Sequence, residues 1–135
     1  MNDCIFCKII AGEIPSHKVY EDDEVFAFLD IHPVNLGHTL VIPKEHHKDL
    51  LSTPTELAQK LIIAVQKITP AILGAVGSEG FNLGVNNGES AGQVVFHTHV
   101  HIMPRFSQDR HALWHGKEMS QDELKEVADK IKSNL

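Results

Sequence analysis

Three histidines, His97, His99 and His101, alternate with threonine and apolar residues, and this run constrains the fold more than any other part of the sequence. Successive side chains of a β-strand point to opposite faces, so the alternation predicts a strand over residues 94–103 with all three imidazoles on one face. Three neighbouring buried imidazoles would need many hydrogen-bond partners, which argues against a plain core face. A solvated strand has no need of three alternating histidines, so the run indicates a functional site.

Turn residues that bound short strand-like segments predict four further strands, over residues 18–21, 25–29, 38–42 and 80–85. Pro43 should end the third of them. A loop rich in Gly and Asn, residues 86–93, joins the last two strands of the chain. Short connections favour antiparallel pairing, so the sequence predicts an α+β fold with a five-stranded antiparallel sheet.

Three helices are expected beside the sheet. The first is short and lies within residues 5–11. The second begins near Thr53, which can cap it together with Glu56, and Pro70 should kink or end it. Its core-facing positions follow helical spacing: Leu57, Leu61, Ala64, Val65 and Ile68. Ser120 and Glu123 form a capping box for a C-terminal helix within residues 118–135, with one apolar face made by Leu124, Val127, Ala128 and Ile131.

Size and charge limit the classes of function. A chain of 135 residues without repeats or linkers fits one domain, residues 1–135. A formal net charge of −6 argues against extended nucleic acid as a partner but not against a small nucleotide held by a few donors. No apolar run approaches the ~18–20 residues of a membrane span, and the start, from Met1 to Cys4, lacks a signal-peptide pattern. We therefore expect a cytoplasmic protein that does not bind membranes.

Two chemistries suit the histidine run. The three imidazoles could bind a metal, but His97 and His101 would start ~13 Å apart in a strand, which is too far for joint ligation at ~2.1 Å. Alternatively, the central imidazole could act as a nucleophile, since neutral imidazole attacks well at pH 7 and leaves well afterwards. In that case the flanking histidines would orient it and move protons.

Residues 97–103, His-Thr-His-Val-His-Ile-Met, match the alternating signature of the histidine triad (HIT) superfamily, with Thr98 as a mild departure. The chain also resembles this family over nearly its whole length, and most closely the Hint-like branch with its bacterial zinc-containing relatives. The further matching segments, in the order of the family, are residues 4–10, 28–33, 37–44 and 86–93. The resemblance implies a HIT-like fold that pairs into a homodimer, and enzymatic hydrolysis or transfer at the α-phosphate of nucleotide conjugates.

The resemblance implies a role for individual residues. His99 corresponds to the nucleophile that forms a nucleotidyl-histidine, His101 to the residue that contacts the scissile phosphate, and His38 to a supporting active-site histidine. The residues expected to hold the phosphate are Asn86, Gly92, Gln93, Val94 (through its N–H), His99 and His101. Val94 stands where the Hint branch commonly has serine, so one hydroxyl near the phosphate is missing.

The resemblance implies that the substrate is a purine nucleotide, in the form of an AMP conjugate. Asp30 would accept hydrogen bonds from the ribose hydroxyls, although it could instead be a turn residue before His32. The resemblance implies that a set of apolar residues surrounds the base, although each could equally be ordinary core: Ile5, Phe6, Ile9, Phe28 and Ile31. No organic cofactor is expected.

The two cysteines, Cys4 and Cys7, have the spacing that lets both thiolates bind one tetrahedral zinc ion. Zinc-containing relatives place a further ligand at the position of His46, and His97 can supply the fourth. His47 is a rival for His46, and two free thiols in a short helix are the simpler alternative. A structural zinc at Cys4, Cys7, His46 and His97 would fix the N-terminal segment, residues 1–12, which lines the expected base site.

Three functions remain open on the sequence. The first is a nucleotide hydrolase or transferase acting on adenosine phosphoramidates, aminoacyl-adenylates or dinucleoside polyphosphates. The second is a zinc-dependent hydrolase with the triad as ligands. The third is a non-catalytic nucleotide-binding scaffold.

Overall fold

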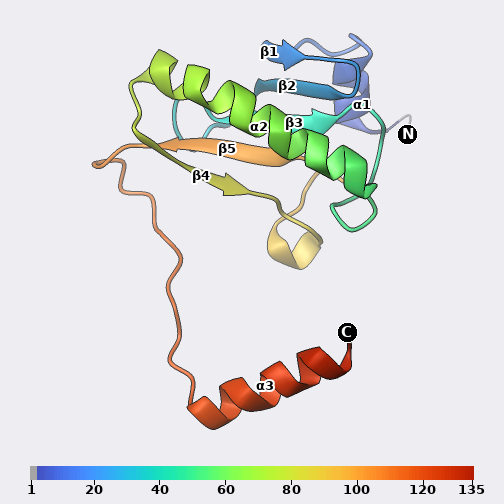
Figure 1. Cartoon of the computed structure of the whole chain (residues 1–135). Helices are drawn as coiled ribbons and strands as arrows, with labels where there is room; N and C mark the ends of the chain where they lie inside the picture. The colour runs from blue at the N-terminus through green and yellow to red at the C-terminus, as the bar shows by residue number, and fades with distance from the viewer. Residues whose placement is uncertain (1–2) are drawn as a thin grey trace.

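The computed structural model describes residues 3–135 and contains a five-stranded sheet with helices on both faces (Figure 1). Neighbouring strands are all antiparallel and follow the order β1-β2-β3-β5-β4. The strands are β1 (Lys18–Glu21), β2 (Val25–Leu29), β3 (Thr39–Pro43), β4 (Gly80–Gly84) and β5 (Val100–Arg105). The predicted five-stranded antiparallel sheet is confirmed.

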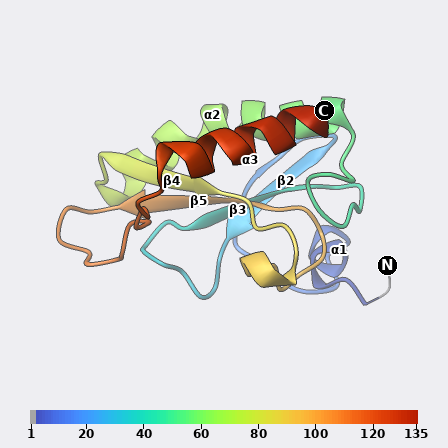
Figure 2. The same cartoon turned by 90° about the horizontal axis from the view of Figure 1, so that it is seen from below.

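The two faces of the sheet carry separate apolar cores, because β2 and β3 are buried on both sides. Helix α2 (Thr55–Val76) packs on one face, where Leu61, Val65 and Ile68 meet Val41 and Val100. Helix α1 (Ile5–Ile10) packs on the other, where Phe6 and Ile9 meet residues of β2 and β3. Figure 2 shows the two helices on opposite sides of the sheet. The predicted buried face of α2 is confirmed.

The start and the end of α2 differ from the prediction. Thr53 does not cap the helix: its hydroxyl donates to the carbonyl of Asp49 and lies 2.8 Å from the hydroxyl of Thr98. Pro70 does not end the helix either, which continues to Val76. By length and composition α2 is apolar enough to cross a membrane, whereas the sequence analysis expected no segment of that kind. In this structure its buried face packs on the sheet.

The histidine run is less regular than predicted. β5 begins at Val100, so of the three histidines only His101 lies within the strand. The preceding segment is held by other contacts: the N–H of Thr98 donates to the carbonyl of His47 at 2.8 Å. His97 and His99 nevertheless face the α1 side of the sheet, where both rings meet the edge of Phe6.

The C-terminal helix α3 (Gln121–Ser133) begins with the predicted capping box of Ser120 and Glu123. An extended segment, residues 106–120, carries it away from the sheet beyond the β4 edge (Figure 1). None of its residues is buried. We call residues 106–135 the C-terminal arm.

Candidate functional site

A cavity of about 400 Å³ lies between α1, the end of β2 and the histidine run. The side chains of Phe6, Ile9 and Phe28 are buried at its floor, whereas Ile5 and Ile31 are exposed at its mouth. It brings together most of the residues that the sequence analysis assigned to nucleoside and phosphate: Ile5, Phe6, Ile9, Phe28, Asp30, Ile31, Asn86, Gly92, Val94, His99 and His101. The cavity therefore has an apolar end beside α1 and a polar end beside the histidines.

His99 is fixed with one ring nitrogen free. Its Nδ1 lies 2.7 Å from the carbonyl oxygen of His97, so Nδ1 carries the proton and donates it. Nε2 is then left with its lone pair. Burial lowers the pKa of His99 below that of a free histidine, so the ring is neutral at pH 7. Phe6 meets the ring edge-on at 5.1 Å and restricts its rotation. These contacts suit a nucleophile.

A backbone amide sets the tautomers of His38 and His101. The N–H of Val34 donates to Nδ1 of His38, so His38 must carry its proton on Nε2. That Nε2 lies 2.9 Å from Nδ1 of His101, which accepts the proton. His101 therefore carries its own proton on Nε2, a buried atom with no partner among residues 3–135. The result is a hydrogen-bond donor without a partner among the described residues, on a ring whose centroid lies 4.9 Å from that of His99.

Burial keeps this pair neutral. It lowers the pKa of His38 and lowers the pKa of His101 to about 4, with the nearby His99 and His38 rings adding to the effect on His101. The carboxylate of Asp30 opposes the shift weakly, with Oδ2 3.6 Å from Nε2 of His38. The pair is therefore uncharged at pH 7.

A second cavity, of about 720 Å³, lies on the other side of His101. It shares only His101 and Asn86 with the first cavity. Arg105, at the end of β5, lines its outer wall and binds Asp109 of the C-terminal arm through two nitrogens. The segment from His111 to Trp114 completes the lining. The histidine pair thus stands at the boundary of two spaces, which suits a substrate with two parts joined near His99.

The loop before the histidine run approaches the polar end of the first cavity. Gly92 has φ +91°, and a Cβ there would lie 3.4 Å from Nδ2 of Asn86, so glycine lets the loop close on the asparagine. Gln93 plays a different part from the one expected. Its side chain is buried and already bonds the N–H of Gly88 and the carbonyl of Lys48. It braces the loop and does not line the cavity.

Asp30 combines the two roles that the sequence left open. Its Oδ1 accepts the N–H of His32 at 2.8 Å, as a turn residue would. Its side chain also lines the first cavity, where Oδ2 has no hydrogen bond within 3.5 Å among the described residues. One oxygen therefore holds the turn while the other remains available to a hydroxyl group.

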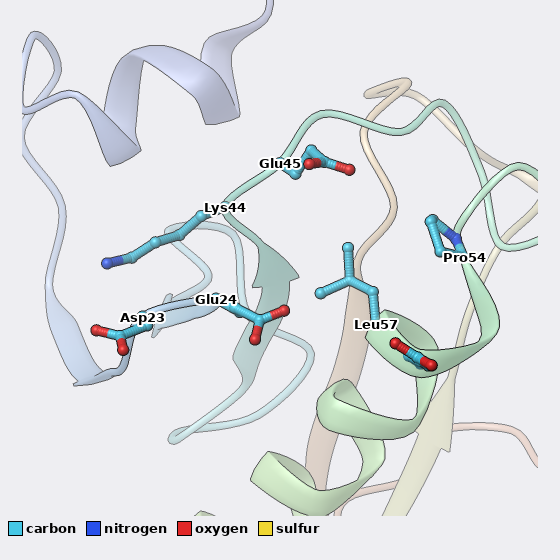
Figure 3. Close-up of a pocket in the computed structure, with 7 residues that line it drawn as sticks. Asp23, Glu24, Lys44, Glu45, Pro54 and Leu57 are labelled. Atoms are coloured by element: carbon cyan, nitrogen blue, oxygen red, sulfur yellow. The ribbon is translucent and has the colours of Figure 1, made fainter.

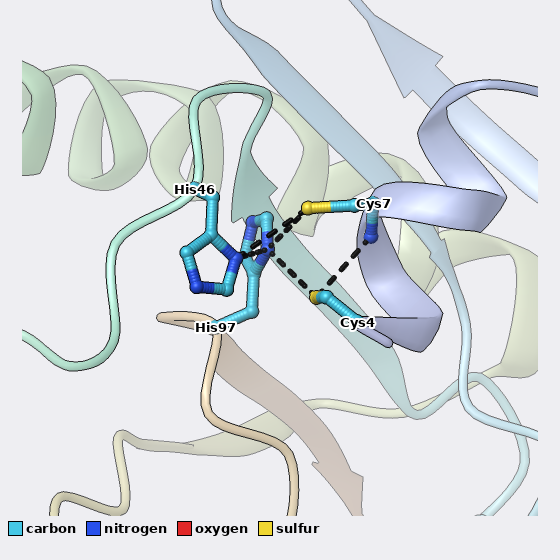
Figure 4. Close-up of side chains that lie close together, drawn as sticks. All are labelled: Cys4, Cys7, His46 and His97. Carbon is cyan, nitrogen blue, oxygen red and sulfur yellow. Dashed lines mark hydrogen bonds between the residues drawn. The ribbon is translucent and has the colours of Figure 1, made fainter. Parts of the chain in front are cut away.

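Cys4, Cys7, His46 and His97 form a tight cluster between α1 and the sheet (Figure 4). Nδ1 of His97 lies 3.4 Å and 3.6 Å from the two sulfurs, and Nδ1 of His46 lies 3.4 Å from Sγ of Cys7. The two Nδ1 atoms are 3.2 Å apart. A tetrahedral ion with ~2.3 Å sulfur and ~2.1 Å nitrogen bonds places such ligands ~3.4–3.8 Å apart, so small shifts let the four atoms bind one ion.

The surroundings of this cluster suit a metal as well. Nε2 of the fully buried His97 donates to the carbonyl of Pro43 at 2.7 Å, which leaves Nδ1 with its lone pair facing the cysteines. Burial and Cys4 raise the pKa of Cys7 to about 11, so a cation is needed to stabilise the thiolate. His47 points elsewhere and pairs with Glu45. The structure places His46, and not His47, in the cluster.

A third hollow, of about 490 Å³, lies near the start of α2 and has a different character (Figure 3). Its walls carry four carboxylates, from Asp23, Glu24, Glu45 and Glu56. Lys44 is the only cation among the described residues that line it, and it is paired with Glu21 at 2.6 Å. A space lined in this way repels an anionic substrate, so the histidine cavity is the candidate site.

Sequence reasoning missed two parts of the site. The amide of Val34 sets the tautomers of two histidines, but a backbone contact four residues away leaves no trace in a residue pattern. The wall formed by Arg105 and residues 111–114 was also missed. Its one sequence signal was the Arg105–Asp109 spacing of opposite charges, which is common at surfaces and carries little information by itself.

Comparison with known proteins places this geometry in a family. The family model described as HIT domain matches residues 11–108. Adenylylsulfatase HINT3 of Arabidopsis thaliana is 48% identical over 92% of this chain, which spans 62% of that longer protein. Protein hit of Bacillus subtilis is 47% identical over 98% of this chain and 94% of its own.

Solved structures agree with the sequence matches. The crystal structure of SMU.412c from Streptococcus mutans has a TM-score of 0.93 and 46% identity, and covers 99% of this chain and 86% of its own. A zinc-bound histidine triad family protein from Mycobacterium smegmatis has a TM-score of 0.78 and 34% identity, and covers 99% of both chains. The chain belongs to the HIT family.

Proposed function

We propose that this protein hydrolyses nucleotide conjugates at the α-phosphate through a covalent nucleotidyl intermediate on His99. The observation that carries the proposal is the pairing of a free Nε2 on His99 with a free N–H on His101, at the boundary of two cavities. The nucleoside fits the cavity beside α1, with its ribose near Asp30. The leaving group fits the cavity beside the C-terminal arm.

In the proposed reaction Nε2 of His99 attacks the phosphorus and the bond to the leaving group breaks. The electron pair of that bond departs with the leaving group, which takes a proton from solvent in the open second cavity. The Nε2–H of His101 donates to the oxygen or nitrogen on which negative charge develops. Water then adds hydroxide to phosphorus, frees His99 and returns one proton to solvent. The products are a nucleoside monophosphate and the protonated leaving group.

The alternative of three histidines around one metal lacks geometric support. Nδ1 of His97 faces the cysteines and its Nε2 binds Pro43, so neither nitrogen is directed at His99. His38 and His101 approach as a hydrogen-bonded pair at 2.9 Å. A scaffold without activity would not require a free nucleophile beside a free donor.

A panel of adenosine 5′-conjugates tests the proposal. We expect turnover of a phosphoramidate (P–N), of adenylyl sulfate (P–O–S) or of a dinucleoside polyphosphate (P–O–P), with AMP as the common product. The plant relative's name, adenylylsulfatase, makes the second compound a substrate to include. AMP release would be measured by chromatography on purified protein with and without a chelator. Binding of AMP without turnover of any conjugate would favour the scaffold.

We also propose that Cys4, Cys7, His46 and His97 hold a structural zinc ion. The ligand spacing and the zinc-bound mycobacterial relative support this assignment. When bound, the ion supplies the positive charge that keeps two thiolates buried. It would tie α1, whose Ile5, Phe6 and Ile9 line the nucleoside cavity, to the segment that carries the histidines.

Loss of both thiols should remove the metal. We expect near one zinc per chain in wild-type protein by elemental analysis, and none in the Cys4→Ala, Cys7→Ala variant. The variant should melt at a lower temperature, because metal binding to the folded state alone adds to stability. The matched control is His47→Ala, which lies outside the cluster and should keep its zinc. Metal-free wild-type protein from zinc-supplemented medium, or zinc retained by the double variant, would contradict the assignment.

A further inference from the structure

The hydrogen bond that sets the tautomers of the histidine pair comes from an exposed segment. The amide of Val34 donates to Nδ1 of His38 at 3.0 Å. Val34 is 37% exposed and lies between β2 and β3, in a segment without helix or strand. Exposed connections of this kind move more than the strands that they join unless other contacts hold them. The position of this amide therefore depends on what anchors residues 31–37.

Three hydrogen bonds anchor the segment to the end of β5 and to the turn that follows it. Nε2 of His111 lies 2.8 Å from the carbonyl oxygen of Val34, so this nitrogen carries a proton and donates it. The side chain of Asn35 donates to the carboxylate of Asp109 and to the carbonyl of Pro104, both at 2.9 Å. The two residues that share the Val34–Asn35 peptide bond are thus both held by residues 104–111.

Asp109 is the centre of this turn. Its side chain is only 7% exposed, and its two oxygens accept hydrogen bonds from Nε and Nη2 of Arg105, from Asn35, and from the N–H groups of Phe106 and His111. Arg110, between Asp109 and His111, has φ +62° and is the one non-glycine residue with positive φ among residues 3–135. Such a conformation persists where the surroundings hold it. The bond from the N–H of His111 to Asp109 spans Arg110, so the carboxylate supplies that constraint.

We propose that Asp109 is a positioning residue, which holds the amide of Val34 in place and thereby keeps the proton of His101 on Nε2. The neutral His38–His101 pair has two possible arrangements. In the present one, Nε2 of His38 donates to Nδ1 of His101, and Nε2 of His101 is a donor. In the other, Nδ1 of His101 donates to His38, and Nε2 of His101 has a lone pair and no proton.

The amide of Val34 selects between these arrangements. The second one places a proton on Nδ1 of His38, which would then face the N–H of Val34. A fixed amide excludes this arrangement, whereas a displaced amide permits it. The effect on catalysis rests on the proposed function, in which His101 donates to developing charge, but the placement of the protons does not.

Nitrogen NMR of the imidazole rings tests the role without an activity assay. Protonated and unprotonated ring nitrogens differ in ¹⁵N chemical shift, so spectra of ¹⁵N-labelled protein at pH 7 report the tautomer of each histidine. In the wild type we expect His38 and His101 each in the single Nε2–H form. In Asp109→Asn both should show two forms, because each oxygen of Asp109 accepts at least two hydrogen bonds and asparagine keeps only one oxygen. Single Nε2–H forms in that variant would overturn the proposal.

A second variant keeps the test decisive if Asp109→Asn disturbs the fold. The double variant Asn35→Ala, His111→Ala removes the side-chain bonds to the segment and leaves Asp109 with Arg105. It should also show two forms of each ring, and single forms would contradict the role. The matched control is Asp22→Asn, which changes a carboxylate that holds the turn at the other end of β2. The control should keep the single forms, and two forms there would mean that any local loosening shifts the protons.

Kinetics connect the role to the reaction. At saturating alkylamine phosphoramidate, kcat of Asp109→Asn should fall in proportion to the fraction of His101 that lacks the Nε2–H. Adding Asp109→Asn to His101→Asn should then cost little more, because both changes remove the same donor, whereas independent sites would show additive losses. Additive losses would overturn an action through His101. If the wild type turns over no conjugate, the proposed function fails, and the NMR comparison still decides whether Asp109 positions the pair.

Discussion

Replacing His99 by asparagine should reduce the turnover of an adenosine phosphoramidate by at least about 10³-fold, because loss of a nucleophile removes the covalent route entirely. Asparagine is a more specific test than alanine, because its amide can still donate to the carbonyl of His97, as Nδ1 of His99 does now. It lacks any atom at the position of Nε2. The fold and much of the affinity for AMP should therefore survive while kcat collapses.

The covalent intermediate gives this prediction a second readout. Wild-type protein mixed with a conjugate labelled at the α-phosphorus and denatured in alkali should retain label, since a phosphorus–nitrogen bond to histidine survives base. The His99→Asn and His99→Ala proteins should retain none. His17→Ala serves as control, because His17 is exposed and lines neither of the two cavities. Retention of more than about a tenth of wild-type kcat by both His99 variants would remove this residue from the nucleophile role.

Where the sequence repeats a simple period, it predicted the fold well. The acidic turn at residues 22–23 and the strand-forming residues on either side of it predicted the bounds of β1 and β2 as the structure has them. The apolar spacing from Leu57 to Ile68 gave the buried face of α2, because a single periodic stripe has only one way to face a sheet. In each of these segments, burial of the apolar side chains favours the same secondary structure that the local residue propensities favour.

Prediction was wrong where a distant contact overrides the local pattern. Thr53 has the residue type and position of a helix cap, yet Thr98 and Asp49 occupy its hydroxyl. The run from His97 to His101 alternates like a strand, yet the backbone of Thr98 binds His47 instead of a neighbouring strand, so β5 starts late. Neither partner can be identified from sequence spacing.

The candidate site shows the same division. Residue types together with the family resemblance indicated His99, His101, His38 and the four possible zinc ligands, and the structure brings each set together. The choice between His46 and His47 depended on which ring the loop after β3 turns inward. The protonated nitrogen of His101 depended on a chain of contacts that begins at the amide of Val34.

That chain of contacts leads to a prediction for His101. Asparagine at this position can accept the Nε2–H of His38 with its carbonyl oxygen, as Nδ1 does now, but it is too short to replace the Nε2–H donor. We expect His101→Asn to lower kcat by about 10²–10³-fold on an alkylamine phosphoramidate, the range found when one donor to developing charge is removed. The fold should change little, because the bond to His38 is preserved.

The dependence on the leaving group separates this role from a structural one. An aryl ester of AMP with p-nitrophenol releases a stable anion that needs little help from a donor, so the His101→Asn protein should lose much less activity on it. Both substrates would be compared in wild type and variant, with AMP affinity measured on the same preparations. If Nε2 of His101 donates to the departing atom, the ratio of the two kcat values changes by at least about tenfold. An equal loss on both substrates would mean that His101 only shapes the site, and its assignment as the donor would be abandoned.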